Sequence, residues 1–233
     1  MSKDVHSLHG QPYELTWHDQ QLLLLSQRAV WLPKQSTLLV ADLHLGKETA
    51  FRAASIPVPD VTAIDLNRLS MLIEKTKCSQ LVILGDLVHS AQGLSRDVIE
   101  QTARWRETHR DVHMQLIVGN HDAKAGPLPK SWDLDCQNIS ACGPFQLRHI
   151  PPETSSPPCL AGHLHPKYRL RTATDRVTLP SFVLTGEVLI LPAFGTFVDG
   201  QAVKMSPARY FVISDQTVLE LQNPRSKLSR MAR

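Results

Sequence analysis

Aspartate, asparagine and histidine side chains recur in this sequence directly after short apolar runs. Carboxylates, amide oxygens and imidazoles without thiolates form a ligand set that favours Mn, Fe, Zn or Co over copper. These residue types therefore predict a site for divalent metal ions. The clusters, in chain order, are Asp42-Leu43-His44, Gly85-Asp86, Gly119-Asn120-His121-Asp122, His149 and Gly162-His163-Leu164-His165.

The spacing within these clusters bears on how many ions they hold. Asp42 and His44 are two positions apart, as are His163 and His165, so each pair would point to one side of an extended strand end. Seven ligands are too many for one tetrahedral zinc ion and suit two ions that share a ligand. The predicted ligands are Asp42, His44, Asp86, Asn120, His149, His163 and His165.

Each cluster taken alone also has a structural interpretation. A D-x-H sequence often caps a strand end, G-D is usually a turn, and an isolated His149 would be a satisfied structural histidine. A structural account must then explain why polar residues repeatedly end buried runs. The metal site is the stronger hypothesis.

The apolar runs predict the elements that position these clusters. TLLVADLH (37–44), QLVILGDLVHS (80–90) and MQLIVGNHD (114–122) suit strands buried on both faces of a sheet. Asp60 would cap a helix through about Lys77, and Ser95 would cap a second helix. Strand–helix–strand units imply parallel pairing, and the carboxyl ends of parallel strands line a ligand crevice. The first helix has an apolar stripe of Val61, Ile64, Leu69, Leu72 and Ile73, and the second has Val98, Ile99, Thr102 and Trp105 on one face.

The two ends of the chain differ from this pattern. Residues 12–32 predict two strands around His18–Gln20. Four later runs are strand-like with no convincing helix between them, which predicts a second, largely antiparallel sheet packed on the first. Those runs are 145–150, 158–166, 181–194 and 208–214. We expect one domain over residues 1–233, with a hairpin at 12–32 and a basic tail at 222–233.

Composition limits the class of protein. The 233 residues are 42% hydrophobic and 20% charged, which excludes disordered and collagen-like chains. The four cysteines form no C-x-x-C pair, no apolar run approaches the length of a membrane span, and no secretory signal is visible. We expect a cytoplasmic protein without a membrane partner. The net charge of +3 comes from the last twelve residues, which hold four basic groups and no acidic one; such a tail can bind nucleic acid or be a solvated terminus.

The order D-x-H, G-D, G-N-H-[DE], H, G-H-x-H resembles that of the calcineurin-like metallophosphoesterases, over roughly residues 37–200. The segments between the motifs are more closely similar to the ligase-associated DNA damage response endonucleases of that superfamily. One departure is Ser55, where that family's pattern has glycine. The similar segments are DLHLGKETAFR (42–52), IPVP (56–59), GDLVHS (85–90), GPFQLRHIP (143–151), GHLHP (162–166) and LPAFGTF (191–197).

The resemblance implies a fold, an activity and a site. The fold is a four-layer α/β-β/α sandwich, and the activity is phosphodiester hydrolysis, with DNA in a repair pathway as the substrate. It also implies functional association with a helicase and an ATP-dependent DNA ligase. Two divalent ions are implied, Mn²⁺ first and Zn²⁺ or Fe as alternatives. One ion would be held by Asp42, His44, Asp86 and His165, and the other by Asp86, Asn120, His149 and His163, with Asp86 bridging.

Other residues near the motifs suggest further roles. His121 is placed to protonate a leaving group, with Asp122 orienting its ring; the alternative is a helper of the ligands without a proton role. His89 can contact substrate or a ligand, or be a surface histidine. Cations for phosphate are Lys47, Arg52, Lys167, Arg169 and Arg171, the last three on one face of a strand.

Two other functions remain open at this point. An enzyme of the same fold can act on small phosphoesters such as cyclic nucleotides, and it would have a closed pocket instead of an open basic cleft. A non-catalytic binding module would require lost ligands, and none is lost. The sequence leaves the oligomeric state open.

Overall fold

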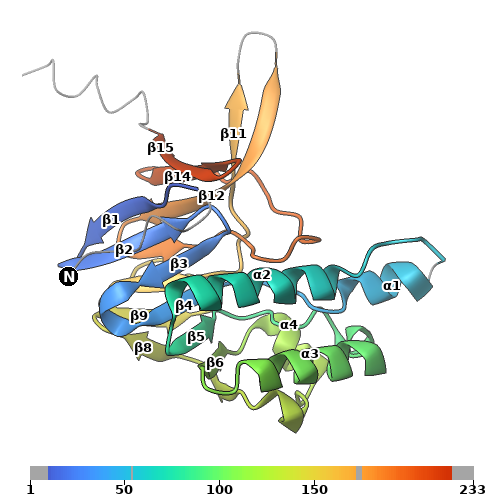
Figure 1. Cartoon of the computed structure of the whole chain (residues 1–233). Coiled ribbons are helices and arrows are strands. Elements are labelled where there is room, and N and C mark those ends of the chain that lie inside the picture. Colours follow the sequence, from blue (N-terminus) through green and yellow to red (C-terminus); the bar gives the residue numbers. More distant parts are fainter. Residues whose placement is uncertain (1–9, 54, 172–174, 222–233) are drawn as a thin grey trace, which may run out of the picture.

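Two β-sheets stacked face to face form the centre of the molecule (Figure 1). The computed structural model describes residues 10–53, 55–171 and 175–221, so the basic tail predicted at 222–233 lies outside the described residues. The seven-stranded sheet has the order β1 (Tyr13–Trp17), β2 (Gln20–Leu25), β3 (Ala29–Leu32), β4 (Thr37–Val40), β5 (Gln80–Ile83), β6 (His113–Ile117) and β7 (Asp135–Gln137).

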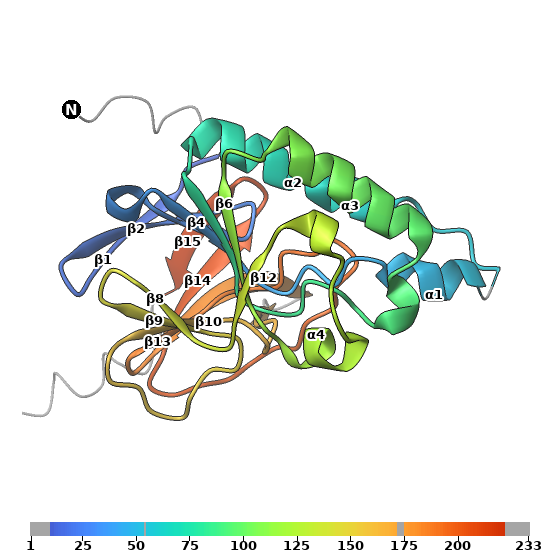
Figure 2. The same ribbon diagram turned by 90° about the horizontal axis from the view of Figure 1, so that it is seen from below.

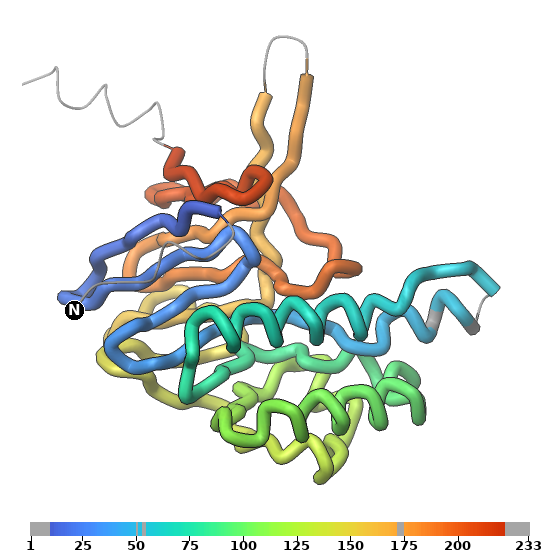
Figure 3. The backbone as a smooth tube through the Cα atoms, viewed as in Figure 1, coloured from blue at the N-terminus to red at the C-terminus, as the bar shows by residue number. Residues whose placement is uncertain are grey.

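The second sheet is formed by the second half of the chain. Its order is β15 (Thr217–Leu221), β14 (Arg209–Ser214), β12 (Arg176–Thr185), β13 (Val188–Ile190), β10 (Cys159–Ala161), β9 (Phe145–Arg148) and β8 (Ser140–Cys142). An additional strand, β11 (Lys167–Arg171), pairs with β12 along its length, and its first residue also bridges to Ala202. β11 and the first part of β12 form an arm that projects from the body (Figure 3).

The helices of the described residues follow strands of the first sheet. They are α1 (Lys47–Ala53), α2 (Val61–Thr76), α3 (Arg96–Thr108) and α4 (Asn120–Ala125), with short 3₁₀ turns at Pro33–Gln35, Ala91–Gly93 and Lys130–Trp132. Figure 2 shows α2 and α3 side by side along the first sheet. None of the helices formed by the described residues combines the length and apolar composition needed to cross a membrane.

Alternation along the central strands explains why their sequences are apolar throughout. In β4, Leu38 and Val40 pack against the helices, while Leu39 faces the core between the two sheets. Because β4, β5, β6 and β7 are parallel and joined through helical segments, both faces of this region are covered. The predicted parallel strand–helix–strand units are therefore present.

Both helix starts lie where the sequence places them. The Asp60 carboxylate accepts from the Ala63 N–H at 3.0 Å, and the Ser95 hydroxyl accepts from the Val98 N–H at 3.4 Å. One residue of the predicted stripe is misplaced: Ile64 is 41% exposed. The buried arc of α2 passes through Asp65 and Leu66 instead.

The N-terminal region holds one strand more than predicted. β1 and β2 form the expected hairpin, with His18 and Asp19 both at positive φ, as a tight two-residue turn requires. A second turn, ending at Arg28 with φ +67°, separates β3 from β2. It contains neither glycine nor proline, so the sequence offered no turn signal there.

The second sheet is largely antiparallel, as predicted, but β9, β10 and β13 run parallel to one another. The predicted strand at 181–194 is a hairpin of β12 and β13, in which Gly186 has φ +52°. The described residues after Trp132 contain no helix. Tyr168 and Leu179 of the arm pack instead on Val183, Tyr210 and Val212 of the second sheet. The structure has the predicted α/β class, with two stacked sheets and helices that follow strands of the first.

Candidate metal centre

The five polar clusters follow the carboxyl ends of five strands, as the sequence predicts. Three come after the parallel strands β4, β5 and β6, and two come after β9 and β10. Backbone hydrogen bonds hold the first two loops together: Asp42 N–H donates to the Gly85 carbonyl at 3.1 Å and His44 N–H to that of Asp86 at 2.9 Å. Loops distant in sequence thus converge on one point.

Asp42, His44 and His165 form a first group, in which all three ligand atoms lie within 4.8 Å of one another. Asp42 Oδ1 lies 3.3 Å from His165 Nε2, and its Oδ2 accepts from the His163 N–H at 2.9 Å. His165 Nδ1 lies 3.0 Å from the Asp199 carbonyl and donates to it, so Nε2 carries the free lone pair.

Asp86, His149 and His163 form a second group with the same spacing of ligand atoms. His149 Nε2 lies 3.0 Å from Asn120 Oδ1, 3.1 Å from His163 Nδ1 and 3.4 Å from Asp86 Oδ2. His149 Nδ1 bonds the Leu84 carbonyl at 3.0 Å, which directs Nε2 toward the group.

Asp86 lies between the two groups. Its Oδ1 accepts from the His121 N–H at 2.9 Å. Its Oδ2 is 3.7 Å from His44 Nε2 and 3.4 Å from His149 Nε2, so one oxygen faces a histidine of each group. A carboxylate in this position can serve ions in both groups.

Left-handed backbone, and not strand alternation, turns these side chains inward. Five of the predicted ligands have positive φ: Asp42 (+54°), His44 (+52°), Asp86 (+49°), His163 (+72°) and His165 (+45°). The extended geometry expected for the pairs Asp42/His44 and His163/His165 is therefore wrong, although their side chains do converge on the site. Non-glycine residues in this region cost free energy and cluster at functional sites, so the backbone itself marks this site.

Two glycines leave room for the ligands. A Cβ on Gly119 would come within 2.2 Å of Asp86 Oδ1. Gly85 has φ +82°, and a Cβ there would meet His149 Nδ1 at 2.1 Å. The glycines of the G-D and G-N-H-D clusters are therefore needed for close approach between loops.

The buried polar atoms of the site fit divalent metal ions. Asp42 Oδ1, His44 Nε2 and His165 Nε2 are buried and have no hydrogen-bond partner among the described residues. Asp42 and Asp86 are 0% and 2% exposed, and buried carboxylates need a counter-charge. The donor set of carboxylate oxygens and imidazole nitrogens can hold metal ions.

Burial and charge prepare the side chains for this role. Burial lowers the pKa of His44 to about 3, and it also lowers the pKa of His163, so both imidazoles are neutral ligands at pH 7. Burial acts to raise the pKa of Asp86, but the hydrogen bond and charge of His149 outweigh it and hold that pKa at about 2.

The structure gives His121 a different anchor from the one predicted. His121 Nδ1 lies 2.7 Å from the His89 carbonyl and donates to it. The carboxylate of Asp122 is buried and accepts from the Val88 and Gly119 N–H groups, both at 3.0 Å, so it fixes these two loops and not the His121 ring. Burial raises the pKa of Asp122.

His89 lies within the site. Its Nδ1 is 3.4 Å from His44 Nδ1, so one ring can donate to the other and leave His44 Nε2 facing Asp86. Burial is the main cause that lowers the pKa of His89. Its ring also stacks on His121, with centroids 5.4 Å apart.

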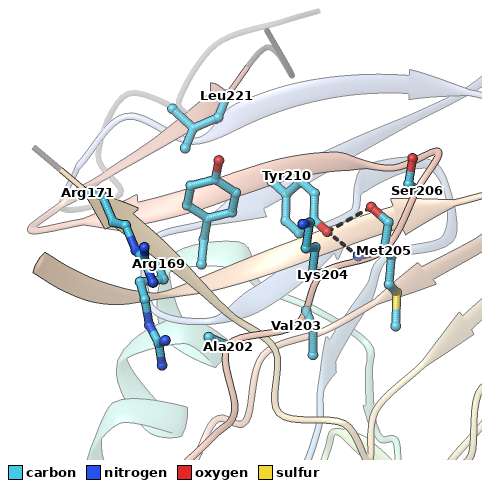
Figure 4. Close-up of a pocket in the computed structure, with 10 residues that line it drawn as sticks. Arg169, Arg171, Ala202, Val203, Lys204, Met205, Ser206, Tyr210 and Leu221 are labelled. Carbon is cyan, nitrogen blue, oxygen red and sulfur yellow. Dashed lines mark hydrogen bonds between the residues drawn. The ribbon is translucent and has the colours of Figure 1, made fainter. Parts of the chain in front are cut away.

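The predicted phosphate-binding cations separate into three places. Lys47 and Lys167 line a hollow of about 540 Å³ between α1 and the root of the arm, and Lys167 Nζ pairs with Asp199 at 2.6 Å. Arg169 and Arg171 lie further out along β11 and line a hollow of about 510 Å³ (Figure 4). Arg52 is exposed on α1, where its guanidinium bonds the Val58 carbonyl at 3.5 Å.

The loop after β13 supports the site in a way that its sequence did not reveal. Gly195 N–H donates to the Asp42 carbonyl at 3.2 Å. Thr196 is held by the Asp65 carboxylate, which also pairs with Arg68 at 2.8 Å. LPAFGTF (191–197) was the available signal, but only the fold reveals that it contacts the D-x-H loop.

Ser55 is the one departure from the endonuclease pattern. It has φ +60°, and its N–H donates to the Arg52 carbonyl at 2.9 Å in the turn after α1. This conformation explains why glycine suits the position.

Comparisons with known proteins agree with this architecture. The chain is similar to the crystal structure of the Pseudomonas putida nuclease MPE, with 34% identity and a TM-score of 0.79, over 90% of this chain and 100% of that chain. A phosphoesterase from E. coli, Yfce, is 15% identical with a TM-score of 0.40, over 79% of this chain and 97% of that one. No model of a protein family matches the sequence, and no curated protein matches it significantly.

Two stacked sheets with carboxylates and imidazoles at the shared ends of their parallel strands define a metallophosphoesterase. The chain belongs to the calcineurin-like metallophosphoesterase superfamily and, within it, to the family of the Pseudomonas putida nuclease. This confirms the predicted superfamily, and with it a hydrolase that acts on phosphodiester bonds.

Proposed function

We propose that this protein is a metal-dependent nuclease that cleaves DNA. The observation that carries the proposal is the buried double group of ligands around Asp86, in a chain that is 34% identical over 90% of its length to a nuclease. Phosphodiester hydrolysis needs a nucleophile, charge compensation at phosphorus and a proton for the leaving oxygen. The residues described below are proposed to supply the charge compensation at phosphorus and the proton for the leaving oxygen.

The seven predicted ligands divide over two divalent ions in this proposal, and Mn²⁺ is the expected metal. Asp42, His44 and His165 would hold one ion, and Asn120, His149 and His163 the other, with Asp86 shared. When bound, such a pair of ions supplies Lewis-acid charge at the phosphate and lowers the pKa of a water molecule. The protein residues fix where these effects act.

His121 is the proposed proton donor. Its Nδ1–H is used by the His89 carbonyl, so the ring is held in one orientation and Nε2 is the nitrogen free to carry a proton. Its N–H bonds Asp86 Oδ1, which ties the ring's position to the shared carboxylate. A proton given from Nε2 to the leaving oxygen removes the need for a free alkoxide.

The arm supplies the proposed contacts to the phosphate backbone. Arg169 and Arg171 lie on one face of β11, and the register places Arg176 of β12 opposite Arg171 on the same face. All three are exposed, whereas Lys167 is half-buried beside Asp199. Phosphate contacts of this kind position a substrate without reading its sequence.

The proposal extends to the biological setting that the resemblance implies. We propose a role in DNA repair, in the cytoplasm, with functional association with a helicase and an ATP-dependent DNA ligase. That association is tested by asking whether helicase and DNA ligase activities copurify with the full chain and are absent from a purification that lacks it.

One assay separates the nuclease from its alternative. The purified chain is incubated with Mn²⁺ and circular single-stranded DNA, with a cyclic nucleotide, and with a simple aryl phosphodiester. A nuclease linearises the circle and hydrolyses the aryl ester, and omission of metal abolishes both reactions. Hydrolysis of the cyclic nucleotide with an intact circle would contradict the proposal and favour a small-molecule phosphoesterase.

A further inference from the structure

A hollow of about 540 Å³ lies beside the metal centre, between α1, the root of the arm and the loop after β13. Two of its walls are bonded to predicted ligands. Lys47 N–H donates to the His44 carbonyl at 3.2 Å, and the Asp199 carbonyl accepts from His165 Nδ1 at 3.0 Å. Asp199 also lines the hollow that contains His163 and His165, so a molecule here would lie beside the ligand groups.

Aromatic rings and cations meet in this hollow. Phe51 and Phe197 both line it and are only partly buried. Their rings contact edge to face, with centroids 5.0 Å apart and an angle of 67°. Lys47 and Lys167 line the same hollow. Ring faces next to ammonium groups form a surface suited to a flat aromatic group that carries phosphate.

The volume agrees with such an occupant. Pockets for small organic groups begin at about 300 Å³, so 540 Å³ accommodates one nucleoside with its phosphate. Phe51 and Phe197 cannot take part in the chemistry themselves, because a phenyl ring neither transfers protons nor binds these metals.

We infer that this hollow is a subsite in which the base of the nucleotide next to the cleaved bond stacks on the face of one of the Phe51 and Phe197 rings and contacts the edge of the other. The inference rests on the proposed nuclease function and names which part of the substrate this side of the site holds. Lys47 then faces the phosphate of that nucleotide, whereas Lys167 is paired with Asp199. The competing explanation is that the two rings only pack α1 against the loop after β13.

The test uses the full chain with Mn²⁺ and an end-labelled oligothymidylate in which one nucleoside is replaced by an abasic tetrahydrofuran. Moving this residue along the strand keeps every phosphate and removes one base at a time. Base–aromatic stacking is worth about 1–3 kcal/mol, so at one fixed offset from the abasic residue the bond should be cut about 5- to 150-fold more slowly.

Variants connect this base effect to the rings. In Phe51→Leu and Phe197→Leu, which keep an apolar contact between α1 and the loop, the ratio of the rates at normal and abasic positions should fall toward 1. In Phe51→Trp the ratio should stay high. Ile56→Ala is the matched control, because Ile56 is 48% exposed just beyond α1 and does not line the hollow.

The outcomes separate this inference from the nuclease proposal. If the wild type cuts oligothymidylate but no offset slows cleavage, or if both leucine variants keep the wild-type ratio, the subsite is disproved and the nuclease remains. If the wild type cuts no oligonucleotide under conditions in which it hydrolyses an aryl diester, the nuclease proposal fails and the inference fails with it.

Discussion

Asp86 is the residue on which the geometry of the site depends most. One of its oxygens is bonded to backbone, and the other faces a histidine of each ligand group, at 3.7 and 3.4 Å. Asp42 is equally buried, and its Oδ1 lies 3.3 Å from His165 Nε2 of the first group. Its 3.8 Å approach to the second group is to His149 Nδ1, the nitrogen that bonds the Leu84 carbonyl and not the one that faces the ligands. A shared carboxylate and a terminal carboxylate should therefore respond differently to loss of charge.

We expect Asp86→Asn to lose more activity than Asp42→Asn. Loss of a partner beyond the ligands typically costs 10- to 100-fold in activity or metal affinity, and loss of a shared ligand should exceed about 100-fold. The measurement is turnover of an aryl phosphodiester together with metal content per chain. Two retained ions and near-normal turnover in Asp86→Asn would refute the shared role.

His121 is half-buried and is not one of the predicted ligands, although a ring nitrogen of it lies within 4.8 Å of ring nitrogens of His44 and His89. Its role is therefore tested by measuring turnover and metal content together. His121→Ala should keep its metal content and lose about 10²- to 10⁴-fold in turnover of a DNA bond, whose leaving oxygen needs a proton. An activated aryl ester should lose far less. An equal loss on both substrates would exclude proton donation. His113→Ala, at the far end of β6, is the control.

At the level of elements, the sequence predicted part of the cationic face of the arm, and the structure added the rest. Alternation along 167–171 predicted three cations on one face, and β11 has that geometry. Arg176 was missed because its position depends on the register of a hairpin, which cannot be derived from alternation in one strand. Helix starts were predictable from Asp60 and Ser95, whereas β3 was missed because the turn before it has no glycine or proline.

We expect alanine at Arg169, Arg171 and Arg176 to weaken DNA binding without changing sequence preference. Each lost phosphate contact should reduce the slope of log K against log salt by roughly 0.7 to 0.9. Binding is measured by fluorescence anisotropy of labelled single-stranded DNA from 50 to 200 mM salt. Hydrolysis of an aryl diester should stay nearly unchanged, because that substrate does not extend to the arm.

The control for this prediction removes the same number of positive charges from a different part of the molecule. Arg96, Arg104 and Arg110 are exposed on or just after α3, on the helical side of the molecule (Figure 1). Their triple alanine variant should keep the wild-type salt slope. If both triple variants reduce the slope equally, binding depends on overall charge or on residues 222–233, and the arm has no specific role.

At the scale of the whole molecule, the predicted ligands come from both sheets. Asp42, Asp86 and Asn120 follow strands of the first sheet, whereas His149, His163 and His165 follow strands of the second. The sequence predicted which residues these are, because polar clusters end apolar runs. It could not predict the inward turn of the side chains, since this depends on left-handed backbone at five non-glycine residues. The supporting contacts of the loop after β13 were equally hidden, because they join residues more than 100 positions apart, such as Asp65 and Thr196.

A site built from both sheets predicts that metal stabilises their packing. An ion that binds only the folded chain adds about 2.7 kcal/mol to the free energy of unfolding at 100 times its Kd. For a chain of 233 residues, this corresponds to a rise in Tm of about 5–10 °C.

Thermal unfolding of the metal-free chain is followed by circular dichroism, with and without Mn²⁺. His113→Gln should show the full rise, because His113 begins β6 at the end away from the site. Asp86→Asn should show a much smaller rise, because its loss weakens both groups of ligands. A wild-type Tm that does not change with metal, in a protein whose activity requires that metal, would show that the ions do not join the two sheets.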